Sequence, residues 1–398
     1  MSVAGNLSPL LFLTFKSLYG ISYSLLGLLV LINFITQLGI DLIFSFFSHK
    51  FNIEKTVRTM PIISAVGLVI YAIIPPLFPS MAYLAIAIGT VIMSVSAGLG
   101  EVLISPVIAT IPSDDPDREM SKLHSVYAWG VVCVVIFSTL FLFFVGEKLW
   151  WLLALMLTLI PISSAILFSG AKIPKMETPE RVSGAFGLLR NPGIWLCVMT
   201  IFFGGAAECT MAQWCSGYLE AALGIEKLWG DIFGVALFAL TLGLGRTLYS
   251  KIGKNIHRAL ILGFLGSAIC YLLAATVEIP FIGLLACAFT GFCVSMLWPG
   301  NLVVAASRFP TGGVFIYALM AAGGDLGASV GPQLIGIITD LSVASPELSE
   351  FALGLGITAE QLGMKMGMLI GTLMSLLGFI LAIAIRKSKS KEADTKQP

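Results

Sequence analysis

Residues 83–112 read YLAIAIGTVIMSVSAGLGEVLISPVIATIP and contain a single charged side chain, Glu101. About 20 apolar residues in a helix are enough to cross the roughly 30 Å hydrocarbon core of a bilayer. The stretch therefore predicts a membrane-spanning helix. A carboxylate at that depth is costly and usually faces a cavity or a partner, so Glu101 is the first candidate functional residue.

The rest of the chain has a similar composition. Hydrophobic residues make up 57% of the 398 residues, charged residues only 11%, and the mean hydropathy is +0.96. Soluble domains carry about 25% charged residues, so this chain has too few polar groups for a water-exposed surface. Its net charge of +1 gives no general attraction to nucleic acid. The seven cysteines lie in apolar runs without metal-ligand spacing and are interpreted as small buried apolar side chains.

Hydropathy predicts eleven full-length spans and one short apolar segment. The spans are 21–47, 59–78, 83–111, 121–145, 149–169, 193–219, 229–249, 257–276, 280–306, 313–339 and 363–385. The short segment, NLSPLLFLTF at residues 6–15, is too short to cross a bilayer alone.

Basic residues predict the orientation. Of the 23 lysines and arginines, 19 lie in the segments 48–58, 112–122, 170–192, 246–258, 307–312 and 386–398. The positive-inside rule places these segments in the cytoplasm. With both termini cytoplasmic the chain crosses an even number of times, so the short segment is interpreted as the end of the first of twelve helices.

The two halves resemble each other. Gly98 precedes Pro106 by eight residues, and Gly291 precedes Pro299 by the same distance. Two six-helix repeats are typical of secondary transporters. We expect an N-terminal bundle over residues 1–170, a cytoplasmic linker over 171–192, a C-terminal bundle over 193–386 and a cytoplasmic tail over 387–398.

The repeat makes two further predictions. Aligning the turns after the second and eighth helices places Asn52 on Gly253, and both residue types tolerate the left-handed backbone of a tight turn. Aligning Gly20 with Gly224 makes the first helix begin about a dozen residues before Met1. Either the start codon is assigned too late, which we prefer, or the protein lacks half a helix.

Glu101 is a candidate proton carrier. At helical spacing it shares a small, polar face with Thr90, Ser94, Gly98 and Ser105. Burial favours the neutral form of a carboxylate, so Glu101 could take up a proton on one side of the membrane and release it on the other. The alternative is a structural glutamate that hydrogen-bonds a neighbouring helix.

Two further carboxylates lie deep in the C-terminal half. Glu208, followed by Gln213 and Trp214, combines groups that suit a polyhydroxylated ligand; the alternative for such aromatic residues is anchoring at the membrane interface. Asp325 starts a polar stripe with Ser329 in a glycine-rich helix, and coupling or hinge stabilisation would explain it equally well.

A fourth carboxylate, Asp41, ends a stripe formed with Asn33 and Gln37 at four-residue spacing. Its position near the cytoplasmic end predicts a gating residue, with Arg246 as a partner from the other half. His124 opens the fifth helix and is a weaker gating candidate, because a lone histidine at a helix start is more often structural.

These residues resemble the Major Facilitator Superfamily, and within it the fucose–galactose–glucose proton symporters. The fourth-helix motif of that group, E-x-x-x-N-P, is similar to Glu101, Ser105 and Pro106, with serine in place of asparagine. Leu123, His124 and Gly130 match the start of the fifth helix, and Trp298–Pro299 match the tenth. The loop His49–Glu54 is similar to a degraded form of the superfamily's loop signature. The family's helix-one acid would fall before Met1.

The resemblance implies an all-α major facilitator fold of twelve helices in a plasma or bacterial inner membrane, with both termini cytoplasmic. We expect a monomeric, non-enzymatic, proton-coupled symporter of a small neutral solute, a sugar or polyol, with no cofactor and no nucleic-acid partner. The candidate proton-coupling residues are Glu101, Glu208 and Asp325. The candidate substrate-binding residues are Glu208, Gln213, Trp214, Asn301, Asn33 and Gln37. The alternatives are a proton-antiport exporter of hydrophobic compounds or metabolites, and a non-transporting receptor or scaffold.

Overall fold

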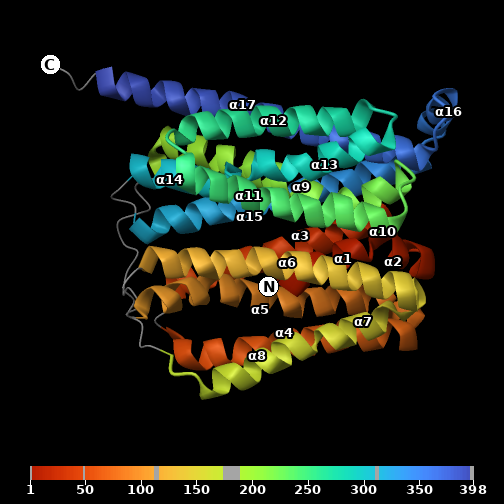
Figure 1. Ribbon diagram of the computed structural model, residues 1–398, viewed down its shortest axis with the longest axis horizontal. Helices are drawn as coiled ribbons and strands as arrows, with labels where there is room; N and C mark the ends of the chain where they lie inside the picture. The colour runs from red at the N-terminus through yellow and green to blue at the C-terminus, as the bar shows by residue number, and fades with distance from the viewer. Residues whose placement is uncertain (1, 48–49, 112–115, 174–188, 310–312, 395–398) are drawn as a thin grey trace. The chain divides into compact units, whose positions relative to one another are not determined.

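The computed structural model describes residues 2–47, 50–111, 116–173, 189–309 and 313–394, and the regular secondary structure of this part is helical (Figure 1). Two compact units divide the chain, Met1–Val182 and Ser183–Pro398. This division falls within the segment 171–192 that the sequence marks as a linker.

The N-terminal unit is built from eight described helices and two short 3₁₀ turns, Pro79–Met81 and Glu147–Leu149. The helices are α1 (Ser2–Leu10), α2 (Phe12–Tyr19), α3 (Tyr23–Phe47), α4 (Ile53–Leu77), α5 (Ala82–Thr110), α6 (Pro116–Val145), α7 (Trp150–Leu157) and α8 (Leu159–Gly170). The last two form one apolar span that is interrupted at Thr158.

The C-terminal unit contains a π-helical segment as well as α-helices. Its elements are α9 (Pro192–Ala221), α10 (Lys227–Gly230), the π segment η5 (Asp231–Ala236), α11 (Leu237–Ile252), α12 (Ile256–Thr276), α13 (Pro280–Val294), α14 (Leu297–Arg308), α15 (Gly313–Ala344), α16 (Pro346–Gly354) and α17 (Ala359–Asp394). Elements α10 to α11 form one span, and α13 with α14 forms another.

All eleven predicted spans have a helical counterpart. Within the described residues, ten spans are long and apolar enough to cross a membrane, and the apolar part of α6, Trp129–Val145, is shorter. Helix α17 runs to Asp394, past the predicted span end at residue 385, because the Lys-rich sequence that follows is compatible with helix.

The same helix pairs contact each other in both units. In the N-terminal unit α3 and α4 pack on α5, α1 packs on α6, and α4 packs on α8. In the C-terminal unit α11 and α12 pack on α13, α9 packs on α15, and α12 packs on α17. These are corresponding positions in a six-helix repeat, so the structure supports the repeat inferred from the sequence.

The turns around Gly20 and Gly224 match residue by residue. Gly20 and Gly224 have φ values of 66° and 65°, a left-handed conformation that favours glycine. Around Gly20 the Lys16 ammonium lies 4.6 Å from the Tyr23 ring centroid. Around Gly224 the same positions hold an ion pair, with Lys227 Nζ 3.9 Å from Glu220 Oε2. The alignment of these two turns is therefore confirmed.

The alignment of Asn52 with Gly253 is wrong. Neither adopts a left-handed backbone, since their φ values are −81° and −67°. Asn52 instead caps the N-terminus of α4, where its side chain accepts a hydrogen bond from the Lys55 N–H. The true counterpart is Asn255, which caps α12 by accepting from the Arg258 N–H.

The short N-terminal segment is an integral part of its unit. Phe15 of α2 packs edge-on against Tyr71 and Trp150, and all three rings are buried. Ser8 of α1 hydrogen-bonds the Tyr71 hydroxyl at 2.9 Å. The prediction for the cysteines is wrong at Cys133, which is exposed on the apolar surface of α6, whereas Cys209 and Cys293 are half-buried and the other four are buried.

Candidate functional site

Helices α3 and α5 share a polar seam in the N-terminal unit. Ser94 Oγ of α5 donates a 2.7 Å hydrogen bond to Asn33 Oδ1 of α3. One turn further along, Gly98 approaches α3 so closely that a Cβ there would lie 3.2 Å from the Gln37 Cα. The next turn brings Asp41 and Glu101 within range of an electrostatic interaction. The stripe on α3 and the polar face of α5 are therefore two sides of one contact.

The carboxylates at the end of this seam differ in accessibility. Asn33, Gln37 and Asp41 are buried, whereas Glu101 is exposed. Asp41 Oδ1 is buried and makes no hydrogen bond with the described residues. An exposed carboxylate thus lies near a buried one, and two like charges in an apolar environment repel each other.

The C-terminal unit places its candidate site where a helix is interrupted. Helix α13 ends at Val294 and α14 begins at Leu297, so the span breaks at Ser295 and Met296. The Arg246 Nε of α11 donates to the Ser295 carbonyl at 3.1 Å. Interrupted helices line the binding sites of many secondary transporters because backbone groups at a break are available to ligands.

Arg246 also binds the central carboxylate of α9. Its Nη2 lies 3.2 Å from Glu208 Oε1, and the Arg246 and Glu208 side chains are 40% and 15% exposed. Glu208 Oε2 is buried and makes no hydrogen bond with the described residues. The sequence predicts that Arg246 pairs with Asp41, but in this structure its partner is Glu208. The sequence predicts that Glu208 and Arg246 lie on helices. It does not predict their contact, because the contact depends on how α9 and α11 are rotated about their axes.

Asn301 lies one turn into α14 and is buried. Its Nδ2 donates to the Leu297 carbonyl at 2.6 Å, and its Oδ1 makes no hydrogen bond with the described part of the chain. The amide thus retains an acceptor.

Trp214 is placed in the core. Its ring is fully buried, and the indole N–H donates a 2.8 Å hydrogen bond to the Pro332 carbonyl of α15. The Trp214 ring is therefore not accessible to a solute in this conformation. Its hydrogen bond connects α9 to α15. Gln213 beside it is also buried.

Asp325 lies in a crossing that glycines make very close. A Cβ on Gly327 of α15 would lie 1.9 Å from the Phe202 carbonyl of α9, and one on Gly205 would lie 2.3 Å from the Gly324 carbonyl. Asp325 is buried beside this contact, and its own carbonyl accepts from Ser329 Oγ at 2.7 Å. The structure therefore places Asp325 where the helix surfaces can approach most closely.

His124 belongs to α6, but its side chain lies outside the described part of the structure, as do those of Ser105 and Pro106. The gating prediction for His124 therefore stays a prediction.

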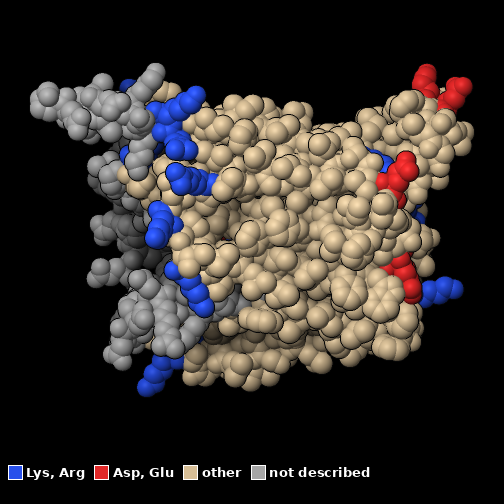
Figure 2. All heavy atoms as spheres, turned by 45° about the horizontal axis from the view of Figure 1, so that its top comes forward, with Lys and Arg blue, Asp and Glu red and all other residues tan. Residues whose placement is uncertain are grey.

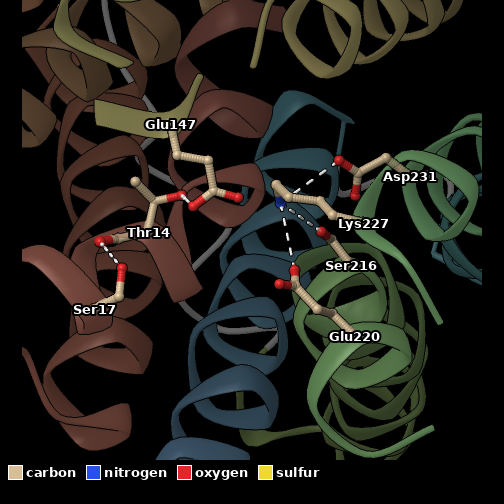
Figure 3. A network of polar contacts seen from close by, with 7 residues as sticks. All are labelled: Thr14, Ser17, Glu147, Ser216, Glu220, Lys227 and Asp231. Atoms are coloured by element: carbon tan, nitrogen blue, oxygen red, sulfur yellow. Dashed lines mark hydrogen bonds and ion pairs between the residues drawn. The ribbon is translucent and has the colours of Figure 1, made fainter. Parts of the chain in front are cut away.

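Two polar networks were not singled out in the sequence. In the C-terminal unit Lys227 Nζ lies 3.6 Å from the fully buried Asp231 and 3.3 Å from Ser216 Oγ, and Figure 3 shows it pointing toward both and toward Glu220. In the N-terminal unit Thr14 Oγ1 donates to Glu147 at 2.9 Å (Figure 3). The four-residue spacing of Lys227 and Asp231 is a helical pair signal that could have revealed the first network.

The chain resembles solved transporter structures over nearly its whole length. A bacterial homologue of the human lysosomal transporter Spinster, in an inward-facing and occupied conformation, has a TM-score of 0.68 at 12% identity and covers 97% of this chain and 94% of its own. A variant of the nucleoside transporter NupG has a TM-score of 0.69 at 14% identity, with 96% and 95% covered. A variant of the Escherichia coli fucose:proton symporter FucP has a TM-score of 0.61 at 15% identity, with 96% and 95% covered.

At these identities the structural likeness establishes the fold alone. No curated protein sequence matches the chain. A family model, that of the Major Facilitator Superfamily, matches residues 1–332. The match covers most of the chain and agrees with the two helical units and their repeated helix contacts, so the protein belongs to the Major Facilitator Superfamily, a family of transporters.

Proposed function

We propose that the protein is a secondary active transporter that works by alternating access and couples the symport of a small neutral solute, a sugar or polyol, to protons. The observation that carries the proposal is the polar seam between α3 and α5, which ends in the carboxylates of Asp41 and Glu101. Proton carriers need a carboxylate that can be neutral inside the membrane, and such groups are retained there for function.

The two carboxylates have distinct roles in this proposal. Glu101 is exposed and exchanges protons, and the buried Asp41 makes the proton affinity of Glu101 depend on the spacing between α3 and α5. When a conformational change alters that spacing, the proton is released. Asn33 and Gln37 lie on the same seam and contact the solute. In the C-terminal unit the solute is contacted by Glu208, Gln213 and Asn301.

Glu208 and Asp325 are secondary candidates for proton coupling. Glu208 is paired with Arg246, so its protonation would release the guanidinium. The structural similarity to the fucose:proton symporter FucP is compatible with the proposal. NupG, another structurally similar protein, is named as a transporter of nucleosides, which are also polar solutes.

The membrane orientation follows from charge. Lys251, Lys254 and Arg258 surround the turn between α11 and α12, whereas Glu347 and Glu350 lie on α16. On the face drawn in Figure 2 most basic side chains lie at the end away from the acidic ones, although a few basic side chains lie beside the acidic ones. We place the basic end and both termini in the cytoplasm of a cell bounded by a plasma or bacterial inner membrane, with the chain acting as a monomer.

The experiment that tests the proposal uses sealed vesicles with a pH dye outside. Hexoses, deoxyhexoses and polyols are added singly to wild-type protein and to Glu101→Gln. The proposal expects one neutral solute to drive proton uptake that the substitution abolishes, while the control Glu350→Gln on the outer helix α16 retains it. Proton release driven by an apolar dye would instead favour the exporter.

A further inference from the structure

The Glu208–Arg246 pair is the second candidate site, and its chemistry narrows the kind of solute it accepts. The guanidinium uses Nε for the Ser295 carbonyl and Nη2 for Glu208 Oε1. A guanidinium has five N–H donors in a fixed plane, so three are left for other partners. The side chain of Arg246 is 40% exposed, and these donors can therefore be reached by a ligand.

Glu208 offers the complementary group. Oε2 is a buried acceptor without a hydrogen bond from the described residues, and leaving such an acceptor unsatisfied is costly. A group that donates to Oε2 and accepts from Arg246 would satisfy both side chains. The Ser295 carbonyl bond and the ion pair hold the guanidinium in place before a ligand arrives, and Oε2 becomes accessible when the surrounding helices move during transport.

Charge decides which ligand group fits. The pair is already close to neutral, so a ligand carboxylate would bring an uncompensated negative charge next to Glu208, and an ammonium would bring a positive charge next to Arg246. Either charge is costly inside a membrane. A hydroxyl is neutral and both donates and accepts. Two adjacent hydroxyls can bridge a carboxylate and a guanidinium at once.

We propose that Arg246 and Glu208, held at the break between α13 and α14, recognise two vicinal hydroxyl groups of a neutral solute and so determine substrate specificity. This inference rests on the proposed function, because it specifies the solute that the same site binds. The binding that it predicts does not depend on proton coupling. Arg246 then contacts the substrate, instead of forming the gating pair with Asp41 that the sequence predicts. Both Arg246 and Glu208 are required, because each binds one part of the diol.

The test measures binding and transport separately. Purified protein in detergent is titrated with a hexose panel by isothermal calorimetry: neutral sugars, the monodeoxy analogue at each ring position, a uronic acid and an amino sugar. The variants are Arg246→Gln, Arg246→Lys and Glu208→Gln. Arg258→Gln, an exposed arginine at the start of α12, is the matched control. Thermal unfolding of every variant shows whether it is folded.

A hydrogen bond to a charged group is worth roughly 10- to 100-fold in affinity. We expect wild-type protein to prefer one neutral sugar to its deoxy analogues at two adjacent positions by about that factor. Arg246→Gln and Glu208→Gln should bind the sugar and those analogues equally, within roughly 2-fold, and Arg246→Lys should keep part of the preference because it retains a cation but not the planar donors. Arg258→Gln should match wild type.

Three results would overturn the inference. They are stronger binding of the uronic acid or amino sugar, a hydroxyl preference that survives in Arg246→Gln, and no binding of any panel member to folded wild-type protein. The same sugars are then tested for proton-coupled uptake in vesicles. If diol-selective binding is found without proton uptake, the symport proposal fails and the inference stands; if proton uptake is found without hydroxyl selectivity, the reverse holds.

Discussion

Single residues show how this chain accommodates polar groups inside a membrane. Glu208 is compensated by Arg246, and Arg246 reaches a backbone carbonyl that the break between α13 and α14 makes available. Asn33 is satisfied by Ser94 on the neighbouring helix. Glu101 differs, because its side chain is exposed and its neighbour is another carboxylate. This environment is the reason why we propose Glu101 as the group that exchanges protons.

Trp214 provides the first test at this scale. Trp214→Phe removes the hydrogen bond to the Pro332 carbonyl and part of a buried ring, which should lower the stability by about 1–3 kcal/mol. The KM for the transported solute should be unchanged. Thermal unfolding and uptake kinetics measure the two effects, with the exposed Trp129→Phe as control. A KM that rises while the melting temperature stays constant would return Trp214 to the substrate site.

The Asn33–Ser94 hydrogen bond is a second test. Hydrogen bonds between membrane helices contribute about 0.6 kcal/mol on average, with values up to roughly 2 kcal/mol. A double-mutant cycle of Asn33→Ala and Ser94→Ala should give a coupling energy in this range when unfolding is followed in a mixed detergent. A coupling energy of zero would show that the seam between α3 and α5 does not depend on this contact.

At the scale of helices, glycines decide how closely elements approach. Gly327 and Gly205 bring α9 and α15 into backbone contact, and Gly98 does the same for α5 and α3. Their side-chain-free surfaces allow van der Waals packing and place Asp325 and Glu101 near helix crossings. Movement of one helix against the other would change the surroundings of both carboxylates.

A matched pair of glycines tests this packing. Gly327→Ala places a methyl group 1.9 Å from the Phe202 carbonyl, so α9 and α15 must separate at a cost of roughly 1–3 kcal/mol. Gly243→Ala on α11 meets nothing within 4 Å and should be neutral or slightly stabilising. Melting temperatures in detergent distinguish the two. Equal melting temperatures would contradict the close crossing.

The sequence predicts helices well and their interruptions poorly. The eleven spans follow from hydropathy because lipid demands long apolar helices. The break at Ser295 and the interruption at Thr158 each come three or four residues before a proline, Pro299 and Pro161, whose missing backbone N–H is a local signal. The π segment Asp231–Ala236 has no such signal. The Glu208–Arg246 pair could not be predicted, because it depends on the rotation of two helices.

At the scale of the whole molecule the internal repeat organises the chain. Gly20 and Gly224 match in conformation, and Asn52 and Asn255 match as caps. The sequence alignment was right at the first pair and two residues off at the second, because in the second loop Gly253 lies two residues before the capping Asn255. The repeat also shows where the halves differ: Asp41 and Glu101 are a carboxylate pair, whereas the C-terminal unit joins an acid to a base.

Orientation is testable at this scale. In a variant without native cysteines, Glu350→Cys on α16 should react with a membrane-impermeant maleimide in intact cells, because α16 lies in a segment outside the Lys- and Arg-rich segments that the positive-inside rule places in the cytoplasm. Lys254→Cys, in the turn between α11 and α12, should react only after permeabilisation. Labelling of Lys254→Cys in intact cells would invert the proposed orientation.

Counterflow separates the proposed role of Glu101 as carrier of the coupled proton from a role in solute binding. In vesicles without a gradient, the exchange of labelled for unlabelled solute needs binding and translocation but no net proton movement. We expect Glu101→Gln to keep counterflow at a rate similar to wild type and to lose solute-driven proton uptake. Loss of both activities in a folded variant, or retention of proton uptake, would show that Glu101 does not carry the coupled proton.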